Sequence, residues 1–138
     1  MRIFLDTSAL AKRYVKESGS EKVHSKCQKA REIVLSILCV PEMLSAFNRL
    51  RRQQALSIRQ YDDLKTALSE DIAQATVLGL EHAVLSQAIL CLETEPLRTL
   101  DAIHIATAKE ARIDLFISAD RKQCKAATAL GLKTEFVK

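Results

Sequence analysis

The chain has 138 residues, a length that predicts one domain with a hydrophobic core of its own. Apolar residues make up 48% and charged residues 28%, which excludes a disordered or collagen-like chain. The formal net charge is +4, from 21 Lys and Arg against 17 Asp and Glu. This balance permits a polyanionic partner such as nucleic acid but does not require one. The low counts of three Gly and two Pro favour a helix-rich fold with few long loops.

The four cysteines and the first residues bear on the cellular compartment. No CxxC motif is present, and no Cys and His pair has zinc-finger spacing. We therefore expect four reduced thiols, as in a cytoplasmic protein. Residues 3–5 are the only apolar run before Asp6, which is too short for a secretory leader. No run approaches the about 18 apolar residues of a membrane span, so no membrane contact is expected.

In the first part of the chain, short apolar runs alternate with amphipathic stretches. The predicted elements are a strand at 3–5, a helix at 7–15 capped by Thr7 or Ser8, a helix at 18–30, a strand at 33–40 and a helix at 42–55. Pro41 stands just before the last of these helices, a position at which the first helical turn accepts proline.

The same alternation continues to the end of the chain. The predicted elements are a helix at 57–72, a short strand at 76–80, a helix at 81–93, a helix capped by Thr99, a strand at 115–118, a helix from 122 to Gly131 and a strand at 134–137. The strands are apolar on both faces, as in a parallel sheet covered on both sides. The sequence therefore predicts an α/β fold with three αβα layers and a central, mostly parallel sheet.

Four acidic residues follow predicted strands or begin predicted helices. This acidic set consists of Asp6, Glu42, Asp101 and Asp120. Ligands of such folds bind at the carboxyl ends of the strands, so we expect the acidic set to meet at one edge of the sheet. An acidic side chain at a helix N-terminus is stabilised by about 0.3–1 kcal/mol through the helix dipole, and this stabilisation is enough to explain the position of any one of the four. It does not explain an acid at the end of the apolar strand 3–5, nor the convergence of all four.

A divalent cation would reconcile these acids with one another. Carboxylates that lie close together repel and raise each other's pKa, and a bound cation removes this conflict. Oxygen ligands favour Mg²⁺ or Mn²⁺ over zinc. The positions alone therefore favour a metal site. His104 stands three residues after Asp101, and we expect it to be a packed, hydrogen-bonded core residue rather than a ligand or a general base.

Four short strings carry a resemblance to a known family. They are Leu5–Leu10 (LDTSAL), Glu42, Leu100–His104 (LDAIH) and Ile117–Asp120 (ISAD). Their order and spacing closely resemble the PIN-domain family, and within it most of all the VapC-type ribonuclease toxins of type II toxin–antitoxin systems. The resemblance covers the chain as a single PIN-like domain, residues 1–138.

The resemblance implies a metal-dependent endoribonuclease that hydrolyses RNA. The acidic set would be catalytic and would hold Mg²⁺ or Mn²⁺, with Thr7 or Ser118 as the supporting hydroxyl. A VapB-type antitoxin and a second copy of the chain are the implied partners. Basic clusters at 12–16 and 121–125 follow two of the acids, which makes Arg13 and Arg121 the candidates for contacts to RNA phosphates. A solvated charged surface explains either cluster equally well.

Other functions remain open at this point. The implied reaction uses a metal-activated water, which agrees with the lack of a Ser/His/Asp or Cys/His constellation. A stand-alone PIN nuclease in RNA processing and a non-catalytic binding domain on the same fold are alternatives. A phosphoacceptor receiver domain would need paired acids after the first strand, and a DxD-type phosphatase would need an acid at position 8, where the chain has Ser8.

Overall fold

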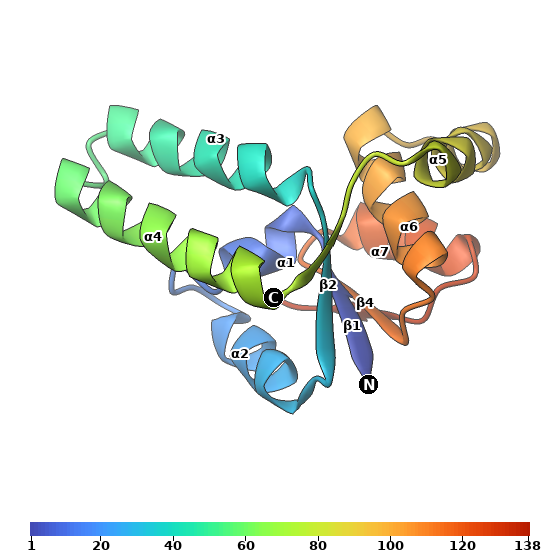
Figure 1. Ribbon diagram of the computed structural model, residues 1–138, viewed down its shortest axis with the longest axis horizontal. Coiled ribbons are helices and arrows are strands. Elements are labelled where there is room, and N and C mark those ends of the chain that lie inside the picture. Colours follow the sequence, from blue (N-terminus) through green and yellow to red (C-terminus); the bar gives the residue numbers. More distant parts are fainter.

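The computed structural model describes residues 1–138, which form a five-stranded parallel sheet with helices on both faces (Figure 1). The strands are β1 (Arg2–Leu5), β2 (Glu32–Ser36), β3 (Thr76–Leu78), β4 (Leu115–Ser118) and β5 (Thr134–Phe136). Their order in the sheet is β3-β2-β1-β4-β5, and every neighbouring pair is parallel. The predicted three-layer α/β fold is confirmed.

Seven helices connect and cover these strands. They are α1 (Thr7–Ala11), α2 (Ser20–Lys29), α3 (Cys39–Arg52), α4 (Ile58–Gln74), α5 (His82–Thr94), α6 (Thr99–Ala111) and α7 (Arg121–Ala129). Figure 1 shows α1 to α4 on one side of the sheet and α5 to α7 on the other. None of the seven combines the length and the apolar character that a membrane crossing requires.

The side chains of the central strand β1 point alternately to the two faces of the sheet and pack into a separate hydrophobic core on each face. In β1, Ile3 and Leu5 face the layer of α1 to α4 and pack in a cluster with Phe47. Phe4 points to the opposite face, where it stacks on Phe116 with ring centroids 5.2 Å apart. Successive residues of a strand point to opposite faces, so a strand covered on both sides needs apolar residues throughout. This packing fixes β1 at the centre of the sheet.

Several predicted boundaries are wrong, those of β2, α3 and α1 among them. Strand β2 ends at Ser36 rather than at residue 40, because the Ser36 hydroxyl accepts a hydrogen bond from the Leu38 backbone N–H at 3.2 Å and the chain turns there. The apolar residues 39–40 therefore begin α3. The cap of α1 is Asp6 rather than Thr7 or Ser8, and α1 ends at Ala11 instead of residue 15.

The helix α6 also differs from the prediction at its start. Thr99 is its first residue rather than its cap, and the capping position is occupied by Arg98, whose side chain makes no capping hydrogen bond. The first backbone N–H groups of a helix lack partners within the helix, so this start is left open toward its surroundings. Asp101 lies in this first turn.

Gly19 is where the start of α2 meets the end of the chain. It has a φ of +92°, and a Cβ at this position would lie 3.0 Å from the carbonyl carbon and oxygen of Val137. We expect Gly19→Ala to lower the free energy of unfolding by about 2–4 kcal/mol, from backbone strain and overpacking together. Gly131→Ala is the matched control, because Gly131 has a φ of +95° with nothing within 4 Å of its added Cβ. Urea unfolding measures both, and equal losses would contradict the close contact at Gly19.

Candidate functional site

The acidic set lies at the carboxyl ends of the central strands. Asp6 directly follows β1, and Asp120 follows β4 with one residue between them. Glu42 lies in the first turn of α3, which comes after β2, and Asp101 lies in the first turn of α6. Because β2, β1 and β4 are parallel neighbours, their carboxyl ends open on the same edge of the sheet.

Asp6 is held by three donors in a buried position. Its side chain is almost fully enclosed, and Oδ1 accepts hydrogen bonds from the Ser8 hydroxyl at 2.7 Å and the Ala9 backbone N–H at 3.0 Å. The Ser118 hydroxyl donates to Oδ2 at 2.5 Å. Burial raises the pKa of Asp6, and it outweighs the hydrogen bonds that act in the opposite direction. A buried carboxylate with a raised pKa is typical of a functional site.

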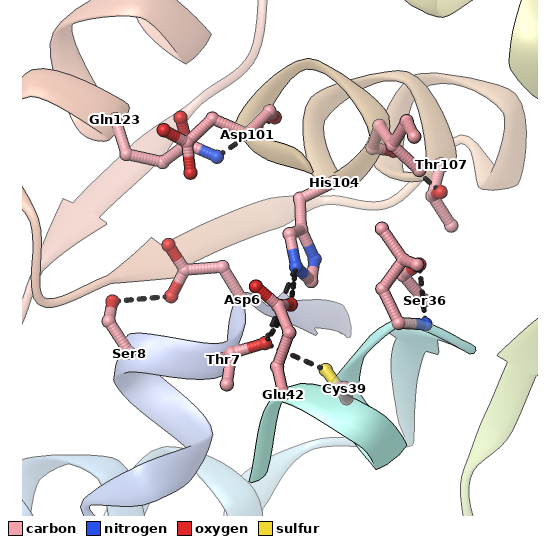
Figure 2. Close-up of polar contacts among 12 residues, drawn as sticks. Asp6, Thr7, Ser8, Ser36, Cys39, Glu42, Asp101, His104, Thr107 and Gln123 are labelled. Atoms are coloured by element: carbon pink, nitrogen blue, oxygen red, sulfur yellow. Dashed lines mark hydrogen bonds and ion pairs between the residues drawn. The ribbon is translucent and has the colours of Figure 1, made fainter. Parts of the chain in front are cut away.

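Glu42 is bound through one of its two carboxylate oxygens. Oε1 accepts from the Thr7 hydroxyl at 2.7 Å and lies 2.7 Å from Nε2 of His104 (Figure 2). Burial raises the pKa of Glu42, but the hydrogen bonds from His104 and Thr7 outweigh it and hold the pKa below its usual value. The carboxylate is therefore ionised at neutral pH.

His104 is buried and hydrogen-bonded, as predicted, but its partner belongs to the acidic set. Its exposed fraction is 2%, and the ring meets the edge of Phe4 at a centroid distance of 6.0 Å. Its position three residues after Asp101 places both side chains on one face of α6. The spacing was visible in the sequence, whereas the contact with Glu42 was not.

The negative charge of Asp120 acts on Asp101. Burial raises the pKa of Asp101, and the negative charges of Asp120 and Glu42 raise it further. Asp120 caps α7, where Oδ1 accepts from the Lys122 backbone N–H at 2.8 Å. The side-chain amide of Gln123 donates to the Asp101 carbonyl at 3.0 Å, while its own Oε1 is buried without a hydrogen-bond partner. Gln123 was not foreseen from the sequence.

The donors at this edge fit a divalent cation in their chemistry. Carboxylate and hydroxyl oxygens are the ligands that Mg²⁺ and Mn²⁺ prefer. The effect of Asp120 and Glu42 on the pKa of Asp101 is the mutual repulsion that a cation would relieve. The structure nevertheless arranges no group of three or more His, Cys, Asp or Glu side chains as a ready metal site. Hydrogen bonds within the chain engage the carboxylates of Asp6, Glu42 and Asp120 instead.

The two arginine candidates lie in different surroundings. Arg121 begins α7 next to Asp120, and its guanidinium lies over the ring of Phe136 at 4.1 Å from the centroid. Arg13 pairs with Asp71 of α4 at 3.6 Å and lines a cavity of about 290 Å³ that contains none of the acidic set. The structure thus places Arg121 beside the acids and does not bring Arg13 to them.

A groove of about 560 Å³ runs beside Glu42 between α1 and α3. Thr7 and Ser8 line it from α1, and Ser45 and Arg49 line it from α3. Ser45 and Arg49 follow Glu42 by three and seven residues, so helical spacing places them on the same face. This helical spacing was visible in the sequence, but neither Ser45 nor Arg49 was among the predicted site residues.

These features define a class of protein: a three-layer α/β domain with an acidic site at the carboxyl edge of its parallel sheet. A model of the PIN domain family matches residues 3–129. The chain therefore belongs to the PIN domain family. It is 30% identical over 132 residues to ribonuclease VapC46 of Mycobacterium tuberculosis (strain ATCC 25618 / H37Rv), a match that spans 94% of this chain and 93% of that protein.

Solved structures of low sequence identity share the fold. FitAcB from Neisseria gonorrhoeae superposes with a TM-score of 0.75 at 18% identity, over 96% of this chain and 95% of that one. The sarcin-ricin loop cleaving toxin VapC20 of Mycobacterium tuberculosis has a TM-score of 0.68 at 18% identity, over 94% and 95%. VapBC2 from Rickettsia felis, bound to a DNA fragment from its promoter, has a TM-score of 0.71 at 12% identity, over all of both chains.

Proposed function

We propose that residues 1–138 act as one PIN domain that hydrolyses RNA phosphodiester bonds with Mg²⁺ or Mn²⁺, as the toxin of a toxin–antitoxin pair. The observation that carries this proposal is Asp6, a buried carboxylate at the carboxyl edge of the sheet, the edge at which the other three acids of the set also lie. The relationship to a ribonuclease over 94% of the chain supports RNA as the substrate. The acidic set supplies the ligands in this proposal.

The hydroxyl and arginine side chains around the acidic set have separate roles in this proposal. A bound divalent ion would acidify a water molecule and neutralise charge on the phosphate. Ser8 and Ser118 orient Asp6 from both of its oxygens, and Thr7 holds Glu42. Arg121, at the open rim next to Asp120, is positioned to contact an RNA phosphate. For Arg13 such a contact stays a prediction that would require its ion pair with Asp71 to open.

The residues around the site favour direct attack by water. The thiol of Cys39 lies beside the site, with its Sγ 3.6 Å from Oγ1 of Thr7. Burial raises the pKa of Cys39 to about 12, so the thiol stays protonated at neutral pH. A protonated, buried thiol is a poor nucleophile, which argues against a covalent intermediate on Cys39.

The proposed partners follow from the relatives and from one exposed surface. The VapBC2 complex suggests a VapB-type antitoxin for this chain as well. A homodimer is supported by an apolar stripe on α5 formed by Leu85, Ile89 and Leu92, whose exposed fractions are 42%, 57% and 40%. Such a stripe at helical spacing is typical of a surface that another chain covers.

Metal dependence tests the proposed function directly. The purified chain, stripped with EDTA, is incubated with tRNA, rRNA and mRNA, and we expect cleavage only after Mn²⁺ or Mg²⁺ is restored. The same ions should stabilise the protein, by about 2.7 kcal/mol at a hundred times the dissociation constant. RNA cleavage and the melting temperature are measured over one Mn²⁺ titration.

The outcomes of that titration separate the alternatives. Cleavage that persists in excess chelator would overturn the metal mechanism. Stabilisation by Mn²⁺ without cleavage of any of the RNA pools would favour the non-catalytic binding domain. Asp63→Asn is a suitable control for loss of one negative charge, because Asp63 is exposed on α4, away from the acidic set.

A further inference from the structure

We propose that His104 is a positioning residue that fixes Oε1 of Glu42 and thereby leaves Oε2 as the oxygen that binds the cation. The inference rests on the proposed metal-dependent function, since it concerns the orientation of one ligand of that site. Nε2 of His104 lies 2.7 Å from Oε1. No hydrogen bond within the chain involves Oε2, and 27% of the Glu42 side chain is exposed.

The chemistry of the two groups defines the direction of this hydrogen bond. An ionised carboxylate can only accept, so Nε2 of His104 carries the proton that it shares with Glu42. The other ring nitrogen, Nδ1, is buried and has no hydrogen-bond partner. Both polar contacts of His104, to Oε1 of Glu42 and at 3.3 Å to Oγ1 of Thr7, are therefore made through Nε2.

The imidazole is held in place by its surroundings rather than by a second hydrogen bond. The rings of Phe4 and His104 pack in a T-shaped arrangement, and the side chain of His104 is only 3% exposed. Figure 2 shows His104 reaching from α6 toward Glu42 on α3 and Thr7 on α1. Side chains from three helices, α1, α3 and α6, therefore meet at one carboxylate oxygen.

Such a clamp has a clear advantage for binding a metal ion. A free glutamate side chain loses rotamer entropy when it is ordered. In this chain the hydrogen bonds to Oε1 order Glu42 before any cation arrives. Partners of this kind around a ligand contribute about 10- to 100-fold to metal affinity or activity in other metal sites. Because Asp101 lies one turn away on the same helix, α6 then contributes both a proposed ligand, Asp101, and the positioning residue His104.

Two substitutions of His104 test the clamp in the full chain, with Mn²⁺ alone as the probe. His104→Leu keeps a bulky apolar side chain but removes the donor, whereas His104→Gln can place an amide N–H near the position of Nε2. We expect His104→Leu to weaken Mn²⁺ binding about tenfold or more in calorimetric titration. We expect His104→Gln to bind Mn²⁺ nearly as the wild type does. Turnover of RNA should fall with His104→Leu while its KM changes little.

A purely structural role of His104 would give a different pattern. His104→Leu would then lower the melting temperature of the metal-free protein but leave the affinity for Mn²⁺ unchanged, and that result would overturn the clamp. If His104→Leu does not fold, Thr7→Val removes the other donor to Oε1 and Thr7→Ser restores it; equal Mn²⁺ affinities for these two variants would overturn the clamp in the same way. A wild-type chain that does not bind Mn²⁺ would instead overturn the proposed function itself.

Discussion

Asp6→Asn is expected to abolish RNA cleavage, with a loss of about a thousandfold or more, while the fold stays intact. The substitution removes the one negative charge at the centre of the acidic set, and metal-assisted stabilisation of a transition state is worth several kcal/mol. Stability should not suffer, because burial already raises the pKa of Asp6 and makes its charge unfavourable in the metal-free protein. The amide oxygen can still accept from the Ala9 backbone N–H.

Cleavage rate and thermal unfolding together check this expectation. The rate is measured on an RNA that the wild type cleaves, at saturating Mn²⁺, beside the Asp63→Asn control. The melting temperature of the metal-free Asp6→Asn protein should equal or exceed that of the wild type. An Asp6→Asn variant that cleaves at the wild-type rate would exclude Asp6 from the chemistry. A variant that unfolds would show that Asp6 is needed as a charged cap of α1.

Asp101→Asn is expected to lower the rate of RNA cleavage and to raise the stability of the metal-free protein. Burial and the charges of Asp120 and Glu42 raise the pKa of Asp101 above the usual aspartate value of 3.8. The folded protein therefore binds this proton more tightly than the unfolded chain does, and the ionised form destabilises the fold at neutral pH. Removing the charge should raise the melting temperature of the metal-free protein by about 3–5 °C, which corresponds to about 1 kcal/mol.

The sign of this effect gives it a distinct pH dependence. The wild type loses stability as the pH rises from 3.8 through the raised pKa of Asp101, and Asp101→Asn has no such loss. The advantage of the variant is therefore present at pH 7 and disappears below pH 3.8. Saturating Mn²⁺ should reverse the order at pH 7, because only the wild type keeps the full set of ligands. If Asp101→Asn were less stable than the wild type at pH 7 without metal, the inferred repulsion of Asp101 by Asp120 and Glu42 would be contradicted.

The sequence was most informative where polar residues interrupt apolar runs. Strand β4 was predicted with its observed bounds, because four apolar or small residues stand between Asp114 and Ala119. Strand β2 was predicted too long, because Cys39 and Val40 continue its apolar run although they begin α3. An apolar residue fits a buried strand or a buried helix turn equally well, and only tertiary packing decides between them.

The positions of the acidic residues were predictable, but their partners were not. Placement at strand ends follows from the parallel topology, which the sequence pattern indicates. The cap of α1 could not be chosen, because Asp6, Thr7 and Ser8 are all good capping residues in consecutive positions. The contact of His104 with Glu42 joins residues 62 positions apart, and no local pattern reports such a pairing.

The strand order ties the two ends of the chain together at the acidic site. Strand β1 pairs with β4 from Ile3 opposite Leu115 to Leu5 opposite Ile117, and the Ser118 hydroxyl reaches Asp6 across 112 residues. During synthesis, Asp6 is the first residue of the acidic set to emerge, and it acquires its neighbours in β4 only after nearly the whole chain has been made. A nascent chain that stops before residue 115 lacks β4 and Asp120 altogether. The order of synthesis itself thus delays assembly of the acidic site until β4 can join the sheet.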